Sequence, residues 1–186
     1  MRYRNIPVLI TLFMLMAFSG AQQKQRIVFF GDSITQAGVQ PRGYITVLGE
    51  MLQQKGWKDR YELLGAGIGG NKVYDLYLRM EEDVLAKNPQ IVVIWVGVND
   101  VWHKRTSGTG TDANKFEKFY NAIIKKLKDK NIKVVVCTPA AIGEKTDFTN
   151  ELDGDLNHYA ALIRKIAQQN NCALADLRKA FLDYNL

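Results

Sequence analysis

Histidine, cysteine and proline are scarce in this chain of 186 residues, which contains two, two and four of them. The histidines and cysteines are widely separated and lack the spacing of metal ligands, so we expect no metal site. There is no internal repeat or low-complexity linker, and 47% of the residues are apolar, which excludes a disordered chain and favours one globular domain. The longest uncharged apolar run, Ile6–Phe18, has 13 residues. A membrane-spanning helix requires roughly 20, so we expect no stable membrane insertion.

The first 21 residues have the pattern of an export signal. Two arginines within Met1–Asn5 precede the apolar run, and the small residues Ser19, Gly20 and Ala21 follow it. We expect cleavage near Ala21, which leaves residues 22–186 as a secreted or periplasmic domain. An uncleaved N-terminal anchor is the alternative interpretation.

The net charge of +6 falls to +4 when Arg2 and Arg4 leave with this signal. The remaining basic residues are spread over several predicted helix faces. No basic footprint for a nucleic acid is formed, so we expect no nucleic-acid partner.

The two cysteines are expected to be free. Cys137 lies near the carboxyl end of one predicted strand, whereas Cys172 lies just before the start of another. In a parallel sheet, these two positions are at opposite ends of the strands, too far apart for a disulfide. We therefore predict that both are buried small hydrophobic residues.

Apolar runs alternate with stretches of helical periodicity along the chain. The predicted strands are Arg26–Phe30, Tyr61–Leu64, Ile91–Val96, Lys133–Thr138 and Ala173–Asp176. The predicted helices are Gly43–Lys55, Lys72–Ala86, Asp112–Lys130, Leu156–Gln169 and Arg178–Tyr184. This alternation predicts an α/β fold of three layers, with helices on both faces of a five-stranded, parallel, flavodoxin-like sheet. The irregular stretches Val101–Thr111 and Ala140–Asp155 follow strand ends, where such sheets bind ligands.

Three motifs follow three successive strands. They are Gly31-Asp32-Ser33-Ile34-Thr35, the cluster Gly65-Ala66-Gly67-Ile68-Gly69-Gly70-Asn71, and Gly97-Val98-Asn99-Asp100. Each alone is consistent with an ordinary turn or helix cap. At three neighbouring strand ends together, they indicate one functional site.

The glycine cluster also matches the dinucleotide-binding pattern, as Gly65-x-Gly67-x-x-Gly70. However, it follows the second strand rather than the first, and the acidic residue expected about 20 positions later is missing. We therefore expect no nucleotide cofactor, and of the functional interpretations considered below, nucleotide binding is the weakest.

From Arg26 to its end, the chain resembles the SGNH (GDSL-type) serine hydrolases, which carry these three motifs in this order. The resemblance implies that Ser33 is the nucleophile and that Ser33, Gly70 and Asn99 form the oxyanion hole. It implies supporting roles for Gly31, Asp32, Gly97 and Asp100. One departure is Gly65, where many relatives have asparagine, which should alter loop packing more than chemistry.

The family's last motif, Asp-x-x-His, supplies the base that activates the serine. Asp155-x-x-His158 fits it literally but precedes the last predicted strand, whereas the family motif follows that strand and the next helix. His103 lies after the third motif and could reach the rim of the site. The base therefore stays unassigned. We expect a C-terminally shortened chain that lacks the closing helix and has little esterase activity as it stands.

The resemblance implies an exported serine hydrolase that cleaves carboxylic esters, either a carbohydrate O-acetyl esterase or a lysophospholipase-like acylhydrolase. A catalytically inactive relative that binds acylated glycans or lipids is the alternative. The aromatic residues Trp95, Trp102 and Tyr74 lie near the motifs and could contact sugars or acyl chains equally well. The sequence does not decide the oligomeric state.

Overall fold

The computed structural model describes residues 23–143, 145–147 and 149–184, so the predicted export signal lies outside the described residues. Five strands form one sheet in the order β2-β1-β3-β4-β5, and every pair is parallel. They are β1 (Gln25–Gly31), β2 (Tyr61–Gly67), β3 (Ile91–Trp95), β4 (Lys133–Cys137) and β5 (Ala173–Ala175). This confirms the predicted flavodoxin-like sheet.

The register aligns the carboxyl ends of three strands. Gly31, the last residue of β1, pairs with Gly67 of β2 on one side and with Trp95 of β3 on the other. The strand order reverses between β1 and β3, and sheets of this kind bind ligands at such a point. The three motifs therefore leave the sheet at one level.

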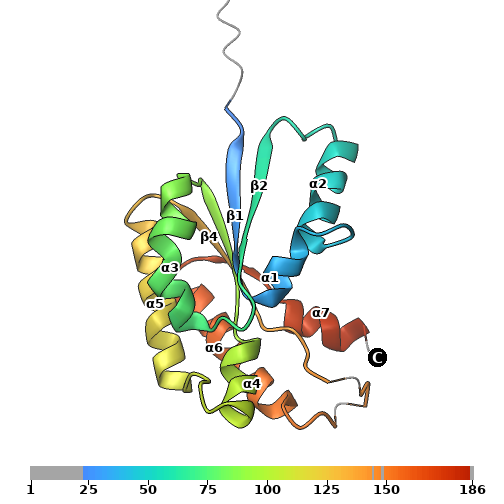
Figure 1. Ribbon diagram of the computed structural model, residues 1–186, viewed down its shortest axis with the longest axis vertical. Coiled ribbons are helices and arrows are strands. Elements are labelled where there is room, and N and C mark those ends of the chain that lie inside the picture. The colour runs from blue at the N-terminus through green and yellow to red at the C-terminus, as the bar shows by residue number, and fades with distance from the viewer. Residues whose placement is uncertain (1–22, 144, 148, 185–186) are drawn as a thin grey trace, which may run out of the picture.

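Helices cover both faces of the sheet, and Figure 1 shows α3 and α5 on one side with α1 and α2 on the other. The helices are α1 (Ser33–Gly38), α2 (Tyr44–Gln54), α3 (Val73–Asp83), α4 (Val98–Thr106), α5 (Ala113–Lys128), α6 (Asp153–Gln169) and α7 (Leu177–Tyr184), with a 3₁₀ turn at Leu85–Lys87. None of these described helices is both long enough and apolar enough to cross a membrane.

The larger core cluster lies between the sheet and the helices α3, α5 and α6. Its pattern is clearest in α5, which buries Phe116, Tyr120, Ile123, Ile124 and Leu127 at helical spacing. A smaller cluster joins Trp95 and Cys137 to residues of α1, α2 and α7, including Tyr44 and Leu177. The two clusters account for the three predicted layers.

Several elements differ from the sequence-based prediction. Helix α1 was not predicted, and α6 begins at Asp153, within the stretch predicted to be irregular. The stretch from Val101, predicted to be irregular, belongs to α4 as far as Thr106. Helix α4 buries only Asn99, Asp100 and Val101, so it shows no apolar periodicity. Strand β2 continues beyond Leu64 to Gly67.

Glycine at position 67 is required by the approach of α1. A β-carbon there would lie 2.1 Å from the main-chain nitrogen of Gln36. The glycines therefore belong to the last residues of the strand as well as to the loop, and they let α1 pack against β2.

The cysteines are both free, as predicted. Cys137 is buried, but Cys172 is half-buried, so the prediction that both are buried was wrong for Cys172. Cys172 precedes β5, an edge strand whose first two residues are exposed.

Candidate active site

Ser33 is the first residue of α1 and directly follows the buried Asp32. The Asp32 carboxylate caps the helix by accepting a hydrogen bond from the Ile34 N–H at 3.0 Å. Burial raises the pKa of Asp32 to about 6. Ser33 itself is exposed, so its hydroxyl is accessible to a substrate.

The glycine loop passes beside this serine. A β-carbon on Gly69 would lie 3.9 Å from the β-carbon of Ser33, and the Gly69 N–H donates to the Gln36 side chain at 2.9 Å. Gly70 has a φ of +75°, which glycine adopts without strain. Its carbonyl accepts a hydrogen bond from Lys72 Nζ at 2.8 Å, which holds the loop in this conformation.

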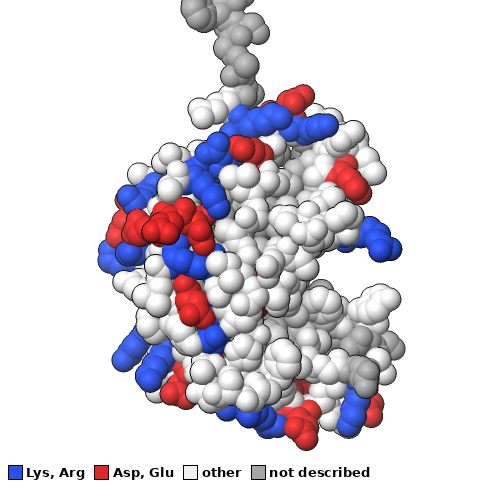
Figure 2. All heavy atoms as spheres, in the orientation of Figure 1, with Lys and Arg blue, Asp and Glu red and all other residues white. Residues whose placement is uncertain are grey.

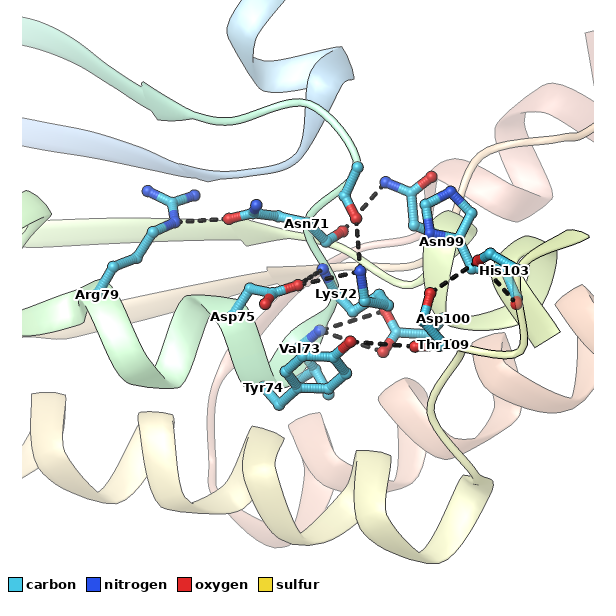
Figure 3. Close-up of polar contacts among 12 residues, drawn as sticks. Asn71, Lys72, Val73, Tyr74, Asp75, Arg79, Asn99, Asp100, His103 and Thr109 are labelled. Atoms are coloured by element: carbon cyan, nitrogen blue, oxygen red, sulfur yellow. Dashed lines mark hydrogen bonds and ion pairs between the residues drawn. The ribbon is translucent and has the colours of Figure 1, made fainter.

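Asn99 lies in the first turn of α4 and is buried. Gly97 begins this turn with a φ of +133°, a conformation that side chains disfavour. The Asn99 Nδ2 donates to the main-chain carbonyl of Asn71 at 3.1 Å (Figure 3). The third motif is thereby connected to the glycine loop.

Asp100, the residue after Asn99, connects the start of α4 to the start of α3. Its carboxylate is fully buried and lies 3.1 and 3.3 Å from the N–H of Val73, the first residue of α3. Burial raises the pKa of Asp100 to about 7. Asp100 therefore fixes the start of α3 against the start of α4.

This raised pKa predicts a pH-dependent stability. Between an ordinary pKa of 3.8 and about 7, the folded chain holds a proton on Asp100 that the unfolded chain has lost. The stabilisation is therefore complete below about pH 4 and is lost as the pH rises towards 7. We expect Asp100→Asn to reduce this decline in the free energy of unfolding by at least about 1 kcal/mol.

Denaturant titrations between pH 4 and pH 8 measure this difference. Asp112→Asn, a change at an exposed carboxylate at the start of α5, is the matched control and should leave the decline as in the wild type. Parallel pH profiles for the wild type and Asp100→Asn would contradict the assignment.

The two histidines occupy different places. His103 is half-buried on α4, one turn after Asn99, and its Cε1 lies 3.7 Å from where a β-carbon on Gly70 would be. Figure 3 shows it beside Asn99. His158 is exposed on α6, next to the ring of Tyr159. Among the described residues, neither forms a hydrogen bond with the Ser33 hydroxyl.

The aromatic residues singled out in the sequence separate into two groups. Trp95 is buried in the smaller core cluster, and its Nε1 donates to the Thr138 carbonyl at 3.1 Å. Trp102 is 45% exposed beside His103. Tyr74 is half-buried, and its hydroxyl donates to the Thr109 carbonyl at 3.1 Å. Only Trp102 therefore presents a largely exposed ring.

A cavity of about 440 Å³ lies beside the serine. It is lined by Ser33, Ile34, Ala37, Gly38, Gly43 and Tyr44. Sequence reasoning missed Tyr44, which looked like one of several apolar residues on an amphipathic helix. Its hydroxyl shares a hydrogen bond of 3.1 Å with Thr35 Oγ1, so the ring is fixed at the cavity wall.

Charged side chains are distributed unevenly over the surface. In Figure 2 they gather on the side of α3 and α5. The surface between α2 and α7 is hollowed, and the described residues that border the hollow in this view are largely uncharged. Within the described ranges, no three His, Cys, Asp or Glu residues are grouped so as to hold a metal ion.

Comparisons with known proteins bear on the family and fold of the chain. The model of the GDSL-like lipase/acylhydrolase family matches residues 29–186. An acetylxylan esterase of Geobacillus stearothermophilus is 28% identical over an alignment 173 residues long that covers 84% of this chain and 78% of that protein.

Two crystal structures extend the comparison. That of an acetyl xylan esterase, AlAXEase, is 69% identical with a TM-score of 0.84 and matches over 86% of this chain and 81% of that one. That of a catalytic mutant of Axe2, an acetylxylan esterase from Geobacillus stearothermophilus, is 25% identical with a TM-score of 0.79. The match covers 88% of this chain and 80% of that chain.

Proposed function

The chain belongs to the GDSL-like lipase/acylhydrolase family, and from this membership we propose that it is a carbohydrate esterase that removes acetyl groups from xylan or a related glycan. The similarity to AlAXEase and to the Geobacillus acetylxylan esterase supports the substrate class. One observation carries the chemistry: Ser33, the Gly70 loop and Asn99 leave three neighbouring strands whose carboxyl ends are level.

In the proposed reaction, Ser33 Oγ attacks the carbonyl carbon of the acetyl ester and its proton passes to a base. The negative charge that develops on the carbonyl oxygen is stabilised by the N–H groups of Ser33 and Gly70 and by the Asn99 amide. When this intermediate collapses, the bond between the carbonyl carbon and the sugar oxygen breaks, the base returns its proton to that oxygen, and Ser33 is left acetylated. Water then attacks the acetyl-enzyme and releases acetate.

The Asn99 amide is suited to this role because Nδ2 carries two hydrogens. The Asn71 carbonyl accepts one of them. The second remains for the substrate oxygen, and the bond to Asn71 fixes the plane in which it points.

The surroundings of Ser33 favour a neutral sugar ester over a phospholipid. The cavity is lined by small or apolar residues and by Tyr44. The described residues around the hollow in Figure 2 are largely uncharged, and we identify no cationic cluster there that would hold a phosphate group. A lysophospholipase-like activity is therefore the less favoured alternative.

Release of acetate from acetylated xylo-oligosaccharides tests this proposal, with release of fatty acid from lysophosphatidylcholine as the comparison. We expect the first rate to exceed the second at least about ten-fold, since the described residues that line the cavity beside Ser33 carry no charge that would bind a lipid headgroup. The Ser33→Ala variant provides the background in both assays. Faster release from the lipid, or acetate release that survives Ser33→Ala, would contradict the proposal.

We also propose that the 186-residue polypeptide turns over slowly. Neither His103 nor His158 is bonded to Ser33, and a serine without a base is a weak nucleophile. In that assay, added imidazole should therefore accelerate acetate release by the wild type but not by Ser33→Ala. Binding of the acetylated sugar without any Ser33-dependent release would instead support a carbohydrate-binding protein, which the unassigned base also favours.

Export is part of the same proposal. It rests on the arginines, apolar run and small residues of positions 1–21, which lie outside the described residues. A polysaccharide substrate lies outside the cell, so export and the proposed substrate agree.

A further inference from the structure

A half-buried arginine on α3, Arg79, contacts the strand ends that carry the site. The Arg79 Nη2 donates to the main-chain carbonyls of Gly31, at the end of β1, and Ala66, near the end of β2, at 2.8 and 3.0 Å. Its Nε donates to the Asn71 side-chain oxygen at 2.7 Å. The side chain is 15% exposed. One guanidinium thus joins both strands and the glycine loop.

Two further contacts hold the guanidinium itself. Its Nη1 pairs with Asp83, one turn later on α3, at 2.6 Å. The guanidinium also lies over the ring of Phe30, 4.6 Å from its centre. The Asp83 carboxylate therefore holds the guanidinium on its solvent side, and the Phe30 ring holds it on the side of the core.

Asn71 connects this arginine to Asn99. Its side-chain oxygen accepts from Arg79, and its main-chain carbonyl accepts from the Asn99 Nδ2 (Figure 3). A flipped Asn99 amide would place its oxygen against the Asn71 carbonyl, and two acceptors repel each other. The position of the Asn71 carbonyl therefore decides where the second Asn99 N–H points.

We propose that Arg79 is a positioning residue for the Asn99 donor and acts through Asn71. It touches neither the substrate nor Ser33. A lysine at this position keeps the charge but lacks the planar fork that serves four acceptors in fixed directions. The proposal rests on the proposed function insofar as Asn99 is assigned to the oxyanion hole.

A purely structural arginine would behave differently. If Arg79 only tied β1 to β2, its loss would lower stability and slow the reaction independently of Asn99. If it acts through Asn99, the two substitutions cannot both exert their full effects in one molecule.

The rate at which a fluorophosphonate probe labels Ser33 distinguishes these cases. We expect Arg79→Met to slow labelling about ten-fold, because a displaced donor still retains part of its effect. The double variant with Asn99→Ala should be no slower than Asn99→Ala alone. Asp83→Asn removes only the outer partner of Arg79 and should label within about two-fold of the wild type. Additive effects in the double variant would overturn the proposal.

A second measurement does not depend on activity. By NMR, the side-chain amide hydrogens of Asn99 should exchange with solvent faster in Arg79→Met, and in Arg79→Lys if the methionine variant does not fold, but not in Asp83→Asn. Unchanged exchange in a folded Arg79 variant would overturn the proposal. If the wild-type Ser33 is never labelled even with added imidazole, the proposed function fails, and the exchange rates still decide the role of Arg79.

Discussion

Replacing Asn99 with alanine is expected to slow the labelling of Ser33 by a fluorophosphonate about 10²–10³-fold, the usual effect of removing one oxyanion-hole donor. The probe's phosphoryl oxygen becomes negatively charged as Ser33 attacks, as the ester carbonyl does. Asn99 is buried, and an alanine in its place has no side-chain N–H to donate. The loss of this donor should therefore lower the rate constant of the labelling step, whereas the affinity for the probe should stay nearly the same.

Intact-mass measurements over time give the labelling rate, and its dependence on probe concentration separates binding from reaction. Asn121→Ala is the matched control, because the Asn121 amide also donates to a main-chain carbonyl, that of Glu117, but on α5. It should label at the wild-type rate. An Asn99→Ala protein that labels within three-fold of the wild type would remove Asn99 from the proposed oxyanion hole.

The second large effect concerns stability. Asp153→Ala is expected to lower the free energy of unfolding by about 3–5 kcal/mol, because it leaves the buried Arg178 without its counter-ion. Arg178 is 1% exposed, and its Nη2 donates to Asp153 at 2.6 Å. Its Nε donates to Asn157 at 2.9 Å, but its Nη1 has no partner among the described residues. The pair joins the start of α6 to α7.

Urea denaturation measures this loss, with Asp155→Ala as the control. Asp155 also lies in the first turn of α6, so both variants lose the same favourable interaction with the helix dipole. Asp155 is exposed, however, and its replacement should change the free energy of unfolding by less than about 0.5 kcal/mol. Equal losses in the two variants would show that the ion pair to Arg178 contributes nothing beyond the dipole.

The sequence predicted the sheet well because apolar runs and helical periodicity are local signals. Ile91–Trp95 is apolar throughout, and α5 repeats its buried residues every three or four positions. Helix α4 was missed for the opposite reason, since two of its three buried residues are polar. Their hydrogen-bond partners, Asn71 of the glycine loop and Val73 at the start of α3, lie 27 or 28 residues away in the sequence.

The same limit applies to the site. The motifs placed Ser33, Gly70 and Asn99 at three strand ends, and the structure puts their segments side by side. Nothing in the sequence separates Arg79 or Arg178 from a surface arginine, because their acceptors come from distant segments. Sequence patterns therefore indicate the candidate reactive residues, whereas the residues that hold them in place emerge only from the packed structure.

The alignment of β1 with β2 and β3 has a consequence for how substrate preference can change. The spacing of the proposed donors depends on the strand register, whereas the cavity beside Ser33 is lined by side chains of α1 and α2, such as Ala37 and Tyr44. Mutations in the cavity wall can therefore reshape the cavity, and with it the preference for one ester over another, while the positions of the proposed donors stay the same. Libraries that vary the exposed Ala37 should yield new specificities without loss of the fold, whereas Tyr44 also packs in the smaller core cluster and tolerates less change.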